Sequence, residues 1–302
     1  MIKKIAVIGA GTMGNGIAHV FAQYGYQVSL IDLDFTALEN GLRTISKNMD
    51  RQIKKELITI GEKELALKNI QSYTQMSLGI MDADLVIEAA TENTELKLNL
   101  FRELSRECQE KTILASNTSS ISITKLASVT NRPEKVIGMH FMNPVPQMKL
   151  VEVIKGYSTS DDVTSQILAL SVALDKNPVE VKDYPGFVAN RILMPMINEA
   201  ISTLYEGVAG VEEIDQVMKL GMAHPMGPLQ LADFVGLDVC LSILRVLYQG
   251  FGNPKYAPCP LLVNMVEAGV LGIKSGEGFY TYLSESKEKK VSKKFITRNL
   301  NI

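Results

Sequence analysis

The stretch IKKIAVIGAGTMG, residues 2–14, decides the fold of this 302-residue chain. Its apolar, β-branched run up to Ile8 is typical of a buried strand, and Gly9, Gly11 and Gly14 follow in the pattern G-x-G-x-x-G. The first glycine permits a tight turn, the second lets the backbone approach a pyrophosphate, and the third lets a helix pack closely on the strand. A strand, this loop and a following helix therefore predict a dinucleotide-binding unit.

An acid supports that prediction. A second apolar strand is expected at Gln27–Asp32, and it ends in a carboxylate 18 residues after Gly14. A carboxylate in this place accepts hydrogen bonds from ribose hydroxyls and repels a 2′-phosphate, so NAD is favoured over NADP. The competing interpretation is a glycine-rich turn without a ligand, but strand, helix and acid all occur at the expected spacing.

Strand-like runs alternate with helical segments up to residue 184. This alternation predicts a doubly wound, mostly parallel α/β sheet. Further strands are expected at residues 84–88, 113–115, 136–140, 150–154 and 178–181.

The pattern changes at Asp183-Tyr184-Pro185-Gly186, after which long helical segments follow and no strand is expected. The sequence therefore predicts a nucleotide-binding domain at residues 1–184 and an all-α domain at residues 185–302. Its helices are expected at Phe187–Tyr205, Glu212–Leu220, Pro228–Tyr248 and Pro260–Ala268. The Lys- and Ser-rich end, residues 284–302, is expected to be mobile.

Composition excludes several classes of protein. The 31 Lys and Arg residues nearly balance the 33 Asp and Glu residues, which argues against a general nucleic-acid or membrane-surface binder. No apolar run approaches the ~18 residues of a membrane helix. Cys108, Cys240 and Cys259 form no CxxC pair and no cluster with histidine, so neither a metal site nor a disulfide framework is indicated. Separated thiols favour the reducing cytoplasm.

His140 is the strongest candidate for acid–base chemistry. It ends a predicted strand at residues 136–140, where open α/β sheets bind their ligands. Glu152 lies in the apolar run LVEVI, and a carboxylate buried in a strand is costly unless it is paired. Pairing with His140 would remove that cost and orient the imidazole. The alternatives are a structural histidine and an edge-strand carboxylate that faces water.

Other polar side chains at predicted strand ends have two interpretations. The hydroxyl-rich segment Ser116–Ser120 could cap a helix, or it could donate hydrogen bonds to a substrate and a nicotinamide. Glu92 and Lys97 could be a helix-end charge and a solvated lysine, or they could line the cofactor cleft. A basic cluster could be a solvated helix face or a phosphate site: Lys47, Arg51, Lys54 and Lys55.

Several sequence blocks carry a resemblance over residues 2–283. These blocks are ASNTSS (115–120), HFMNPVPQMKLVEVI (140–154), DYPGFVANRILMP (183–195), GPLQLADFVGLD (227–238) and KSGEGFY (274–280). With the glycine-rich fingerprint, they resemble the L-3-hydroxyacyl-CoA dehydrogenase family, and especially its bacterial 3-hydroxybutyryl-CoA members. The resemblance implies a Rossmann-like domain, NAD as cofactor and oxidation of (S)-3-hydroxyacyl-CoA, as in fatty-acid β-oxidation or butyrate metabolism.

The resemblance also implies roles for single residues. His140 is similar to the family's catalytic acid–base residue and Glu152 to its orienting partner. Ser119 and Asn190 resemble residues that bind the reacting oxygen of the substrate and its surroundings, and Lys55 resembles a contact to the CoA phosphates. The implied cofactor contacts are Gly9, Gly11, Gly14, Asp32, Glu92, Lys97, Ser119, Asn143 and Lys274.

Two other functions stay open at this point. One is a dehydrogenase of the same superfamily with a non-CoA substrate, of the L-gulonate or carnitine type, and the other is a non-catalytic, crystallin-like NAD-binding protein. The resemblance further suggests a homodimer through the helical domain. Apolar residues of that domain could form its own core or such an interface: Met194, Ile197, Ile201, Leu241, Leu244 and Leu247.

Overall fold

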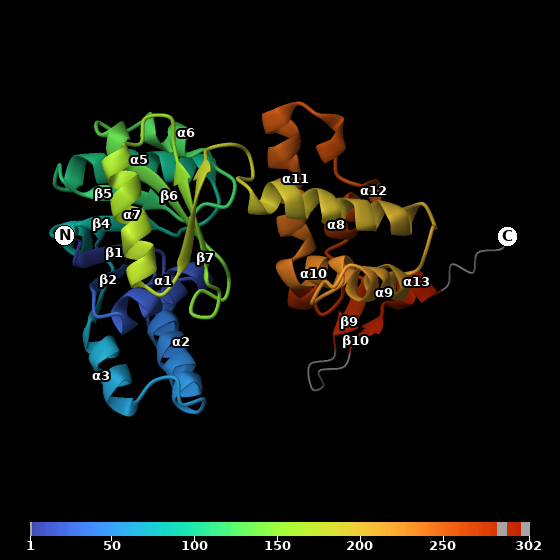
Figure 1. The fold of residues 1–302 in the computed structure, drawn as a ribbon, viewed down its shortest axis with the longest axis horizontal. Helices are drawn as coiled ribbons and strands as arrows, with labels where there is room; N and C mark the ends of the chain where they lie inside the picture. The colour runs from blue at the N-terminus through green and yellow to red at the C-terminus, as the bar shows by residue number, and fades with distance from the viewer. Residues whose placement is uncertain (1, 283–288, 297–302) are drawn as a thin grey trace. The chain divides into compact units, whose positions relative to one another are not determined.

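The chain divides into two compact units, residues 1–187 and 188–302 (Figure 1). The computed structural model describes residues 2–282 and 289–296. The sequence-based boundary at residue 184 lies three residues before the end of the first unit.

Within the described part of the chain, the first unit holds an eight-stranded sheet with the order β3-β2-β1-β4-β5-β6-β7-β8. The strands are β1 (Lys4–Ile8), β2 (Gln27–Ile31), β3 (Ile70–Tyr73), β4 (Leu85–Glu88), β5 (Ile113–Ser116), β6 (Val136–Phe141), β7 (Leu150–Lys155) and β8 (Asn177–Lys182). The order reverses between β1 and β4, and open sheets bind ligands at the carboxyl ends of strands beside such a reversal.

Neighbouring strands are parallel except β6 and β7, which are antiparallel. The connection Met142–Lys149 explains the exception, because a parallel crossover needs about a dozen residues or more. The central strands are apolar on both faces because both faces are covered. The predicted doubly wound, mostly parallel sheet is confirmed.

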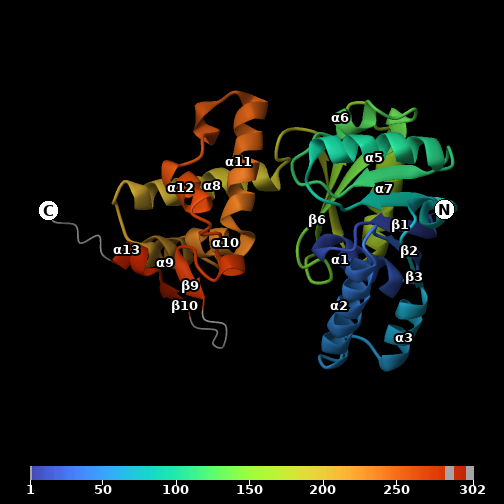
Figure 2. The same ribbon diagram turned by 180° about the vertical axis from the view of Figure 1, so that it is seen from behind.

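Helices cover the two faces of the sheet in two layers. Figure 1 looks onto α7 and Figure 2, seen from behind, onto α5. One layer consists of α1 (Thr12–Gln23), α2 (Phe35–Ile53), α3 (Ile60–Lys68) and α7 (Asp161–Ala173). The other consists of α4 (Met76–Ile80), α5 (Thr94–Glu107) and α6 (Ile123–Ala127).

Four short elements of this unit were not predicted from the sequence: α3, β3, α4 and α6. The strand β3 shows why, because it is a four-residue edge strand with no fully buried residue. Its pairing with β2, rather than an apolar run of its own, makes it a strand.

The second unit is helical, as predicted. Its described helices are α8 (Ala189–Tyr205), α9 (Val211–Gly221), α10 (Pro228–Val235), α11 (Leu237–Phe251), α12 (Pro260–Glu267) and α13 (Lys293–Ile296). The single helix expected at Pro228–Tyr248 is wrong, since Gly236 has φ +100° and separates α10 from α11. No helix among the described residues of either unit is long and apolar enough to span a membrane.

The expectation of no strand in the second unit is also wrong. Strands β9 (Tyr280–Tyr282) and β10 (Lys289–Val291) form a small antiparallel pair. Regular structure at β10 and α13 contradicts the expected mobile end there, whereas residues 284–288 and 297–302 lie outside the described residues.

Two buried aspartates hold this end of the chain against the helices. Asp233, on α10, accepts hydrogen bonds from Phe279 N–H and Tyr280 N–H, each at 2.9 Å. Asp215, on α9, accepts one from the Tyr280 hydroxyl at 2.8 Å. A Cβ on Gly278 would lie 1.8 Å from Asp233 Oδ1, so the close approach requires glycine. The blocks GPLQLADFVGLD and KSGEGFY thus meet in one structural joint.

Candidate active site

His140 and Glu152 face each other across β6 and β7. The antiparallel register pairs them directly, and His140 Nδ1 lies 2.8 Å from Glu152 Oε2. Both side chains are buried. A proton on Nδ1 would be donated to the carboxylate, which leaves Nε2 as the basic nitrogen. The predicted proximity of these two residues is thus present in the structure.

Two neighbours fix the surroundings of His140. The ring of Phe187 lies 6.0 Å from the His140 ring, centroid to centroid. The Asn117 side chain, in the loop after β5, accepts a hydrogen bond from Phe141 N–H at 3.0 Å. This bond ties the hydroxyl-rich loop of residues 116–120 to the end of β6, immediately beside His140.

The glycine-rich loop has the geometry that the fingerprint predicts. Gly9 has φ +100°, and a Cβ there would lie 2.7 Å from the carbonyl oxygen of Ala89. A Cβ on Gly14 would lie 1.7 Å from Gly9 O, whereas one on Gly11 would meet nothing within 4 Å. The backbone at Gly11 is therefore open to a ligand at the N-terminus of α1, where unpaired N–H groups favour phosphate.

Asp32 is hydrogen-bonded to this loop. Its carboxylate accepts hydrogen bonds from Ala10 N–H at 2.8 Å and from Asp34 N–H at 3.0 Å. A cavity of about 550 Å³ opens beside it, lined also by Gly9 and Ala90. Its other walls are largely apolar side chains of β1, β2, α4 and α5. The cavity is wide and apolar enough for the flat base of a dinucleotide, and the Asp32 carboxylate lies at its edge.

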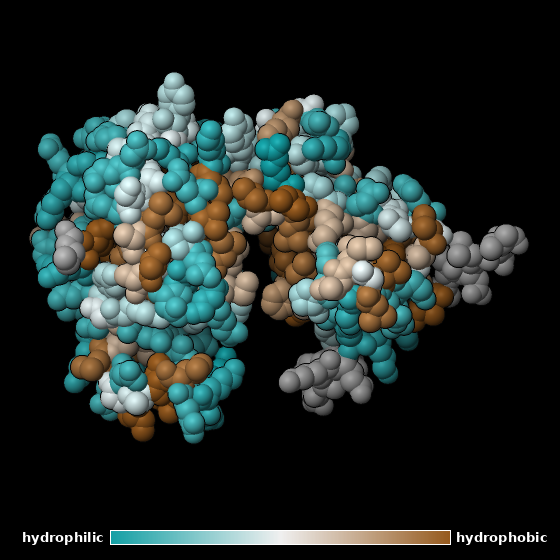
Figure 3. Space-filling view, in the orientation of Figure 1, coloured by the Kyte–Doolittle hydropathy of each residue, from teal (hydrophilic) through white to brown (hydrophobic). Residues whose placement is uncertain are grey.

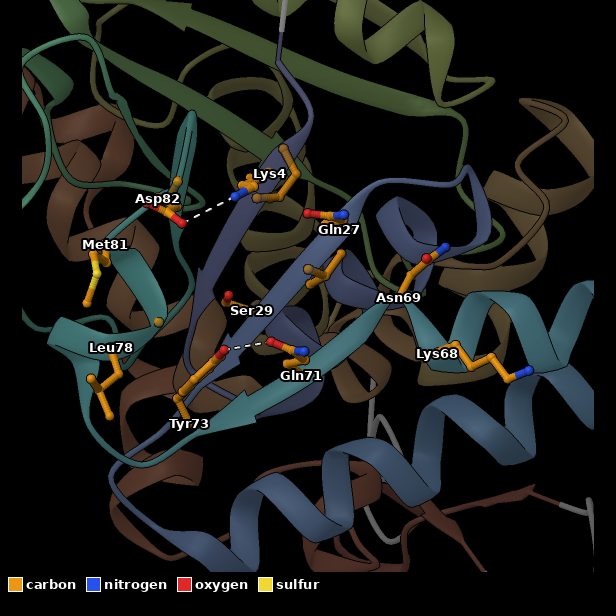
Figure 4. A pocket seen from close by; sticks show the side chains of 14 residues that line it. Lys4, Gln27, Ser29, Lys68, Asn69, Gln71, Tyr73, Leu78, Met81 and Asp82 are labelled. Carbon is orange, nitrogen blue, oxygen red and sulfur yellow. Dashed lines mark hydrogen bonds and ion pairs between the residues drawn. The ribbon is translucent and has the colours of Figure 1, made fainter.

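A second cavity, of about 290 Å³, lies where β1 and β2 begin, at Lys4 and Gln27 (Figure 4). Four of its polar side chains form two pairs: Lys4 Nζ lies 3.2 Å from Asp82, and the Tyr73 hydroxyl donates to Gln71 at 2.7 Å. Ligands of doubly wound sheets bind at the opposite, carboxyl ends of the strands. We therefore assign no role to this cavity in the candidate site.

Glu92 accepts hydrogen bonds from the loop after β5. Its Oε1 accepts hydrogen bonds from Thr118, Ser119 and Ser120 at 2.6–3.2 Å. Lys97 Nζ lies 3.4 Å from its other oxygen. Burial opposes ionisation of Glu92, but the Lys97 cation and these donors outweigh it and lower the pKa of the carboxyl. The structure therefore joins three predicted site residues in one network: Glu92, Lys97 and Ser119.

Glu88 belongs to this network and was not predicted as a site residue. It ends β4, is fully buried, and lies 2.5 Å from Lys97 Nζ. The sequence contained a signal, since a carboxylate ends the apolar run DLVIE. That signal carries no information about the partner, which follows nine residues later in α5.

The remaining predicted residues belong to several elements, two of them in each unit. Asn143 is exposed just after β6, and Lys55 is exposed in the turn after α2. In the second unit, Asn190 is buried near the start of α8, and Lys274 forms an ion pair with Asp238.

The other two histidines and the three cysteines lie in different elements from His140. His19 is buried in α1, and its Nε2 lies 3.1 Å from Gln23 and 3.2 Å from Gln52. His224 lies in the loop between α9 and α10. The three cysteines all fall within the described residues and are buried without a disulfide.

Both units of the chain match models of one protein family. Residues 4–184 match the family model "3-hydroxyacyl-CoA dehydrogenase, NAD binding domain", and residues 186–282 match the C-terminal domain of the same family. The chain belongs to the 3-hydroxyacyl-CoA dehydrogenase family. The predicted family and its cofactor, NAD, are thereby confirmed.

Individual relatives are similar over nearly their whole length. A probable 3-hydroxybutyryl-CoA dehydrogenase of Bacillus subtilis is 55% identical, with 93% of this chain and 98% of the relative covered. The human mitochondrial hydroxyacyl-coenzyme A dehydrogenase is 42% identical, with 93% and 92% covered. The crystal structure of (S)-3-hydroxybutyryl-CoA dehydrogenase from Ralstonia eutropha is 50% identical, with a TM-score of 0.90 over 94% of this chain and 100% of that one.

Proposed function

We propose that this member of the 3-hydroxyacyl-CoA dehydrogenase family interconverts (S)-3-hydroxyacyl-CoA and 3-ketoacyl-CoA with NAD, and that 3-hydroxybutyryl-CoA is its substrate. The single observation that carries the proposal is the buried His140–Glu152 pair, 2.8 Å apart at the carboxyl end of β6. The names of its relatives at 50–55% identity support this choice of substrate.

His140 and Glu152 would carry the proton transfer. In the oxidative direction, Nε2 of neutral His140 takes the proton of the C3 hydroxyl while Nδ1–H stays bonded to Glu152. The carboxylate then stabilises the imidazolium that forms. Bound NAD supplies the acceptor for the hydride that leaves C3. General acid–base catalysis of this kind contributes ~10²–10⁴-fold in rate.

Other residues would bind the reacting groups. Ser119 and Asn190 would donate hydrogen bonds around the C3 oxygen, which carries negative charge in the transition state. Ser119 and Asn143 would contact the nicotinamide side, and Glu92 and Lys274 would be further contacts to the cofactor.

The first unit fits the rest of the cofactor. Gly9, Gly11 and Gly14 would bring the pyrophosphate to the N-terminus of α1, where an added Cβ at Gly11 meets no atom within 4 Å. Asp32 would bind the ribose hydroxyls beside the 550 Å³ cavity, and its negative charge favours NAD over NADP.

The basic cluster at the end of α2 would bind the CoA phosphates, with Lys55 as the proposed contact. Lys47, Lys54 and Lys55 are exposed, and no carboxylate among the described residues forms an ion pair with any of them. Exposed cations gathered in one place create a positive local potential, which attracts anions such as the phosphates of CoA.

The protein would act as a cytoplasmic homodimer in fatty-acid β-oxidation or butyrate metabolism. The apolar residues first considered for the interface, such as Met194 and Leu244, are buried in the core of the second unit itself. Other apolar side chains gather on the surface over α8 and α9 (Figure 3). Exposed apolar residues of α8, α9 and the positions that adjoin them include Ile192, Val208, Val217, Leu220 and Met222. Exposed patches of this kind mark protein–protein interfaces, and sedimentation at micromolar concentration would detect the dimer.

The proposed function is tested by NADH oxidation with acetoacetyl-CoA, longer 3-ketoacyl-CoA esters, and the keto acids of L-gulonate and carnitine. We expect acetoacetyl-CoA to react fastest and His140→Gln to lower its turnover ~10²–10⁴-fold, because the acid–base group is lost. A preference for a substrate without CoA would overturn the assigned substrate. NADH binding without any turnover would favour the non-catalytic protein.

The CoA site has its own test in the double variant Lys54→Glu and Lys55→Glu. Charge reversal should raise the KM for acetoacetyl-CoA about tenfold at low salt, with a smaller increase at high salt, because surface charges are screened. The KM for NADH should not change. An equal KM for acetoacetyl-CoA in wild type and variant would remove this assignment.

A further inference from the structure

A buried ion pair at the end of β4 stands between the cofactor cavity and the loop that carries Ser119. Glu88 and Lys97 are 0% and 1% exposed, and their charged atoms lie 2.5 Å apart. Two charges withdrawn from water destabilise the folded state strongly unless their remaining hydrogen-bonding groups are satisfied. The other hydrogen bonds of Glu88 and Lys97 therefore show how the two charges are satisfied and which segments of the chain the pair holds in place.

The ammonium of Lys97 is saturated by protein acceptors. It has three N–H donors. Three acceptors surround it: Glu88 Oε1 at 2.5 Å, Glu92 Oε2 at 3.4 Å and the carbonyl oxygen of Ala90 at 3.4 Å. With its side chain 1% exposed, Lys97 acts on its surroundings through these neighbours.

The carboxylate of Glu88 connects two loops. Oε1 accepts a second hydrogen bond from Ala90 N–H at 2.7 Å, and Oε2 accepts one from the Ser116 hydroxyl at 2.6 Å. The Ser116 hydroxyl accepts in turn from Thr118 N–H at 3.2 Å. Ala90 lines the 550 Å³ cavity, while Thr118 stands directly before Ser119.

The pair reaches Ser119 by a second route as well. Lys97 holds Glu92, and Glu92 Oε1 accepts hydrogen bonds from the amide of Ser119 at 3.0 Å and from its hydroxyl at 3.2 Å. The position of the Ser119 hydroxyl therefore depends on the buried pair from both sides.

We propose that Glu88 and Lys97 are positioning residues, which fix Ala90 in the wall of the cofactor cavity and hold Ser119 in place for the substrate. The second part of this inference rests on the proposed function, and the first part does not. Lys97 thus acts on the cofactor cavity through Glu92 and Ala90.

A double-mutant cycle tests the link to Ser119. Glu88→Gln keeps the shape of the side chain but removes the charge that holds Lys97, and we expect it to lower kcat for acetoacetyl-CoA about 10–100-fold, as loss of supporting hydrogen bonds does at other sites. Ser119→Ala should also lower kcat. If Glu88 acts through Ser119, the double variant should retain about fivefold or more activity above the product of the two single effects.

The matched control is Asp233→Asn. It also neutralises a buried carboxylate that accepts several hydrogen bonds, but it lies in the second unit. Combined with Ser119→Ala, it should give effects that multiply. Multiplying effects for Glu88→Gln as well would show a merely structural role and overturn the link to Ser119.

Binding of NADH, followed by its fluorescence, tests the cavity wall without any substrate. Glu88→Gln should raise the Kd of NADH several-fold, and an unchanged Kd would overturn this part of the proposal whatever the substrate is. If Glu88→Gln does not fold, Ser116→Ala breaks the same chain at one hydrogen bond and replaces it in the cycle. Failure of the wild type to reduce any 3-ketoacyl-CoA would refute the proposed function, and the NADH result would still decide the role of the pair.

Discussion

Glu152 and Asp233 are both buried carboxylates, 2% and 1% exposed, yet their surroundings differ in kind. Glu152 faces the imidazole of His140, which can gain or lose a proton. Asp233 faces two backbone N–H groups and the hydroxyl of Tyr282, which do not change charge at neutral pH. A buried carboxylate beside a titratable partner can support a proton transfer, whereas Asp233, beside donors of fixed charge, stabilises the structure around it.

Of the substitutions at Glu152 and Asp233, Glu152→Gln should have the largest effect on kcat. The amide keeps the shape of the side chain and can still accept from Nδ1–H, but it cannot stabilise the imidazolium. We expect kcat for acetoacetyl-CoA reduction to fall about 100-fold, within the range of acid–base contributions. The free energy of unfolding, measured in urea, should change by less than about 1 kcal/mol, because a buried charge is also removed. A threefold or smaller loss of kcat would show that Glu152 does not orient and stabilise His140.

The sequence predicted the pairing of Glu152 with His140 but not the hydrogen bonds of Asp233. His140 and Glu152 stood out because each is a polar residue in or at the end of an apolar strand, and adjacent strands bring such residues together. The pairing partners of Asp233 lie 46 and 47 residues further along the chain. Local patterns carry no information about contacts at such a separation, and β9 is only three residues long.

The same difference between local and distant sequence information applies to other features of both units. The glycine-rich loop, Asp32 and the order of strands and helices follow from local patterns, so the sequence indicates them well. The turn at Gly236 has a positive φ, which glycine permits but does not require. The helix predicted at residues 228–248 therefore ran through this turn. Glu88 was read only as the end of a strand, because its role depends on Lys97 and Ser116 from two later elements.

Asp233→Asn should show the opposite behaviour to Glu152→Gln. Oδ2 accepts from both Tyr280 N–H and the Tyr282 hydroxyl, and Oδ1 accepts from Phe279 N–H. An amide nitrogen in either place meets a donor, so at least one hydrogen bond is lost. We expect the free energy of unfolding to fall by about 1–3 kcal/mol in urea titrations, with kcat unchanged at temperatures where the variant is folded. A large loss of kcat in the folded variant would mean that the joint of α10 and β9 affects the chemistry.

The pH dependence of this loss is the smallest effect and the most specific. Burial raises the pKa of the Asp233 carboxyl to about 6 from 3.8, although the N–H groups of Tyr280 and Phe279 and the Tyr282 hydroxyl oppose the rise. A carboxyl with a raised pKa stabilises the folded state below its ordinary pKa, and this contribution is lost as the pH rises through about 6. The asparagine does not titrate, so the difference in unfolding free energy between wild type and Asp233→Asn should narrow by about 1 kcal/mol from about pH 5 to about pH 7.5. If the three donors outweighed burial, the pKa would lie below 3.8 and the difference would stay constant from about pH 5 to about pH 7.5, so this measurement shows which effect dominates at the Asp233 carboxylate.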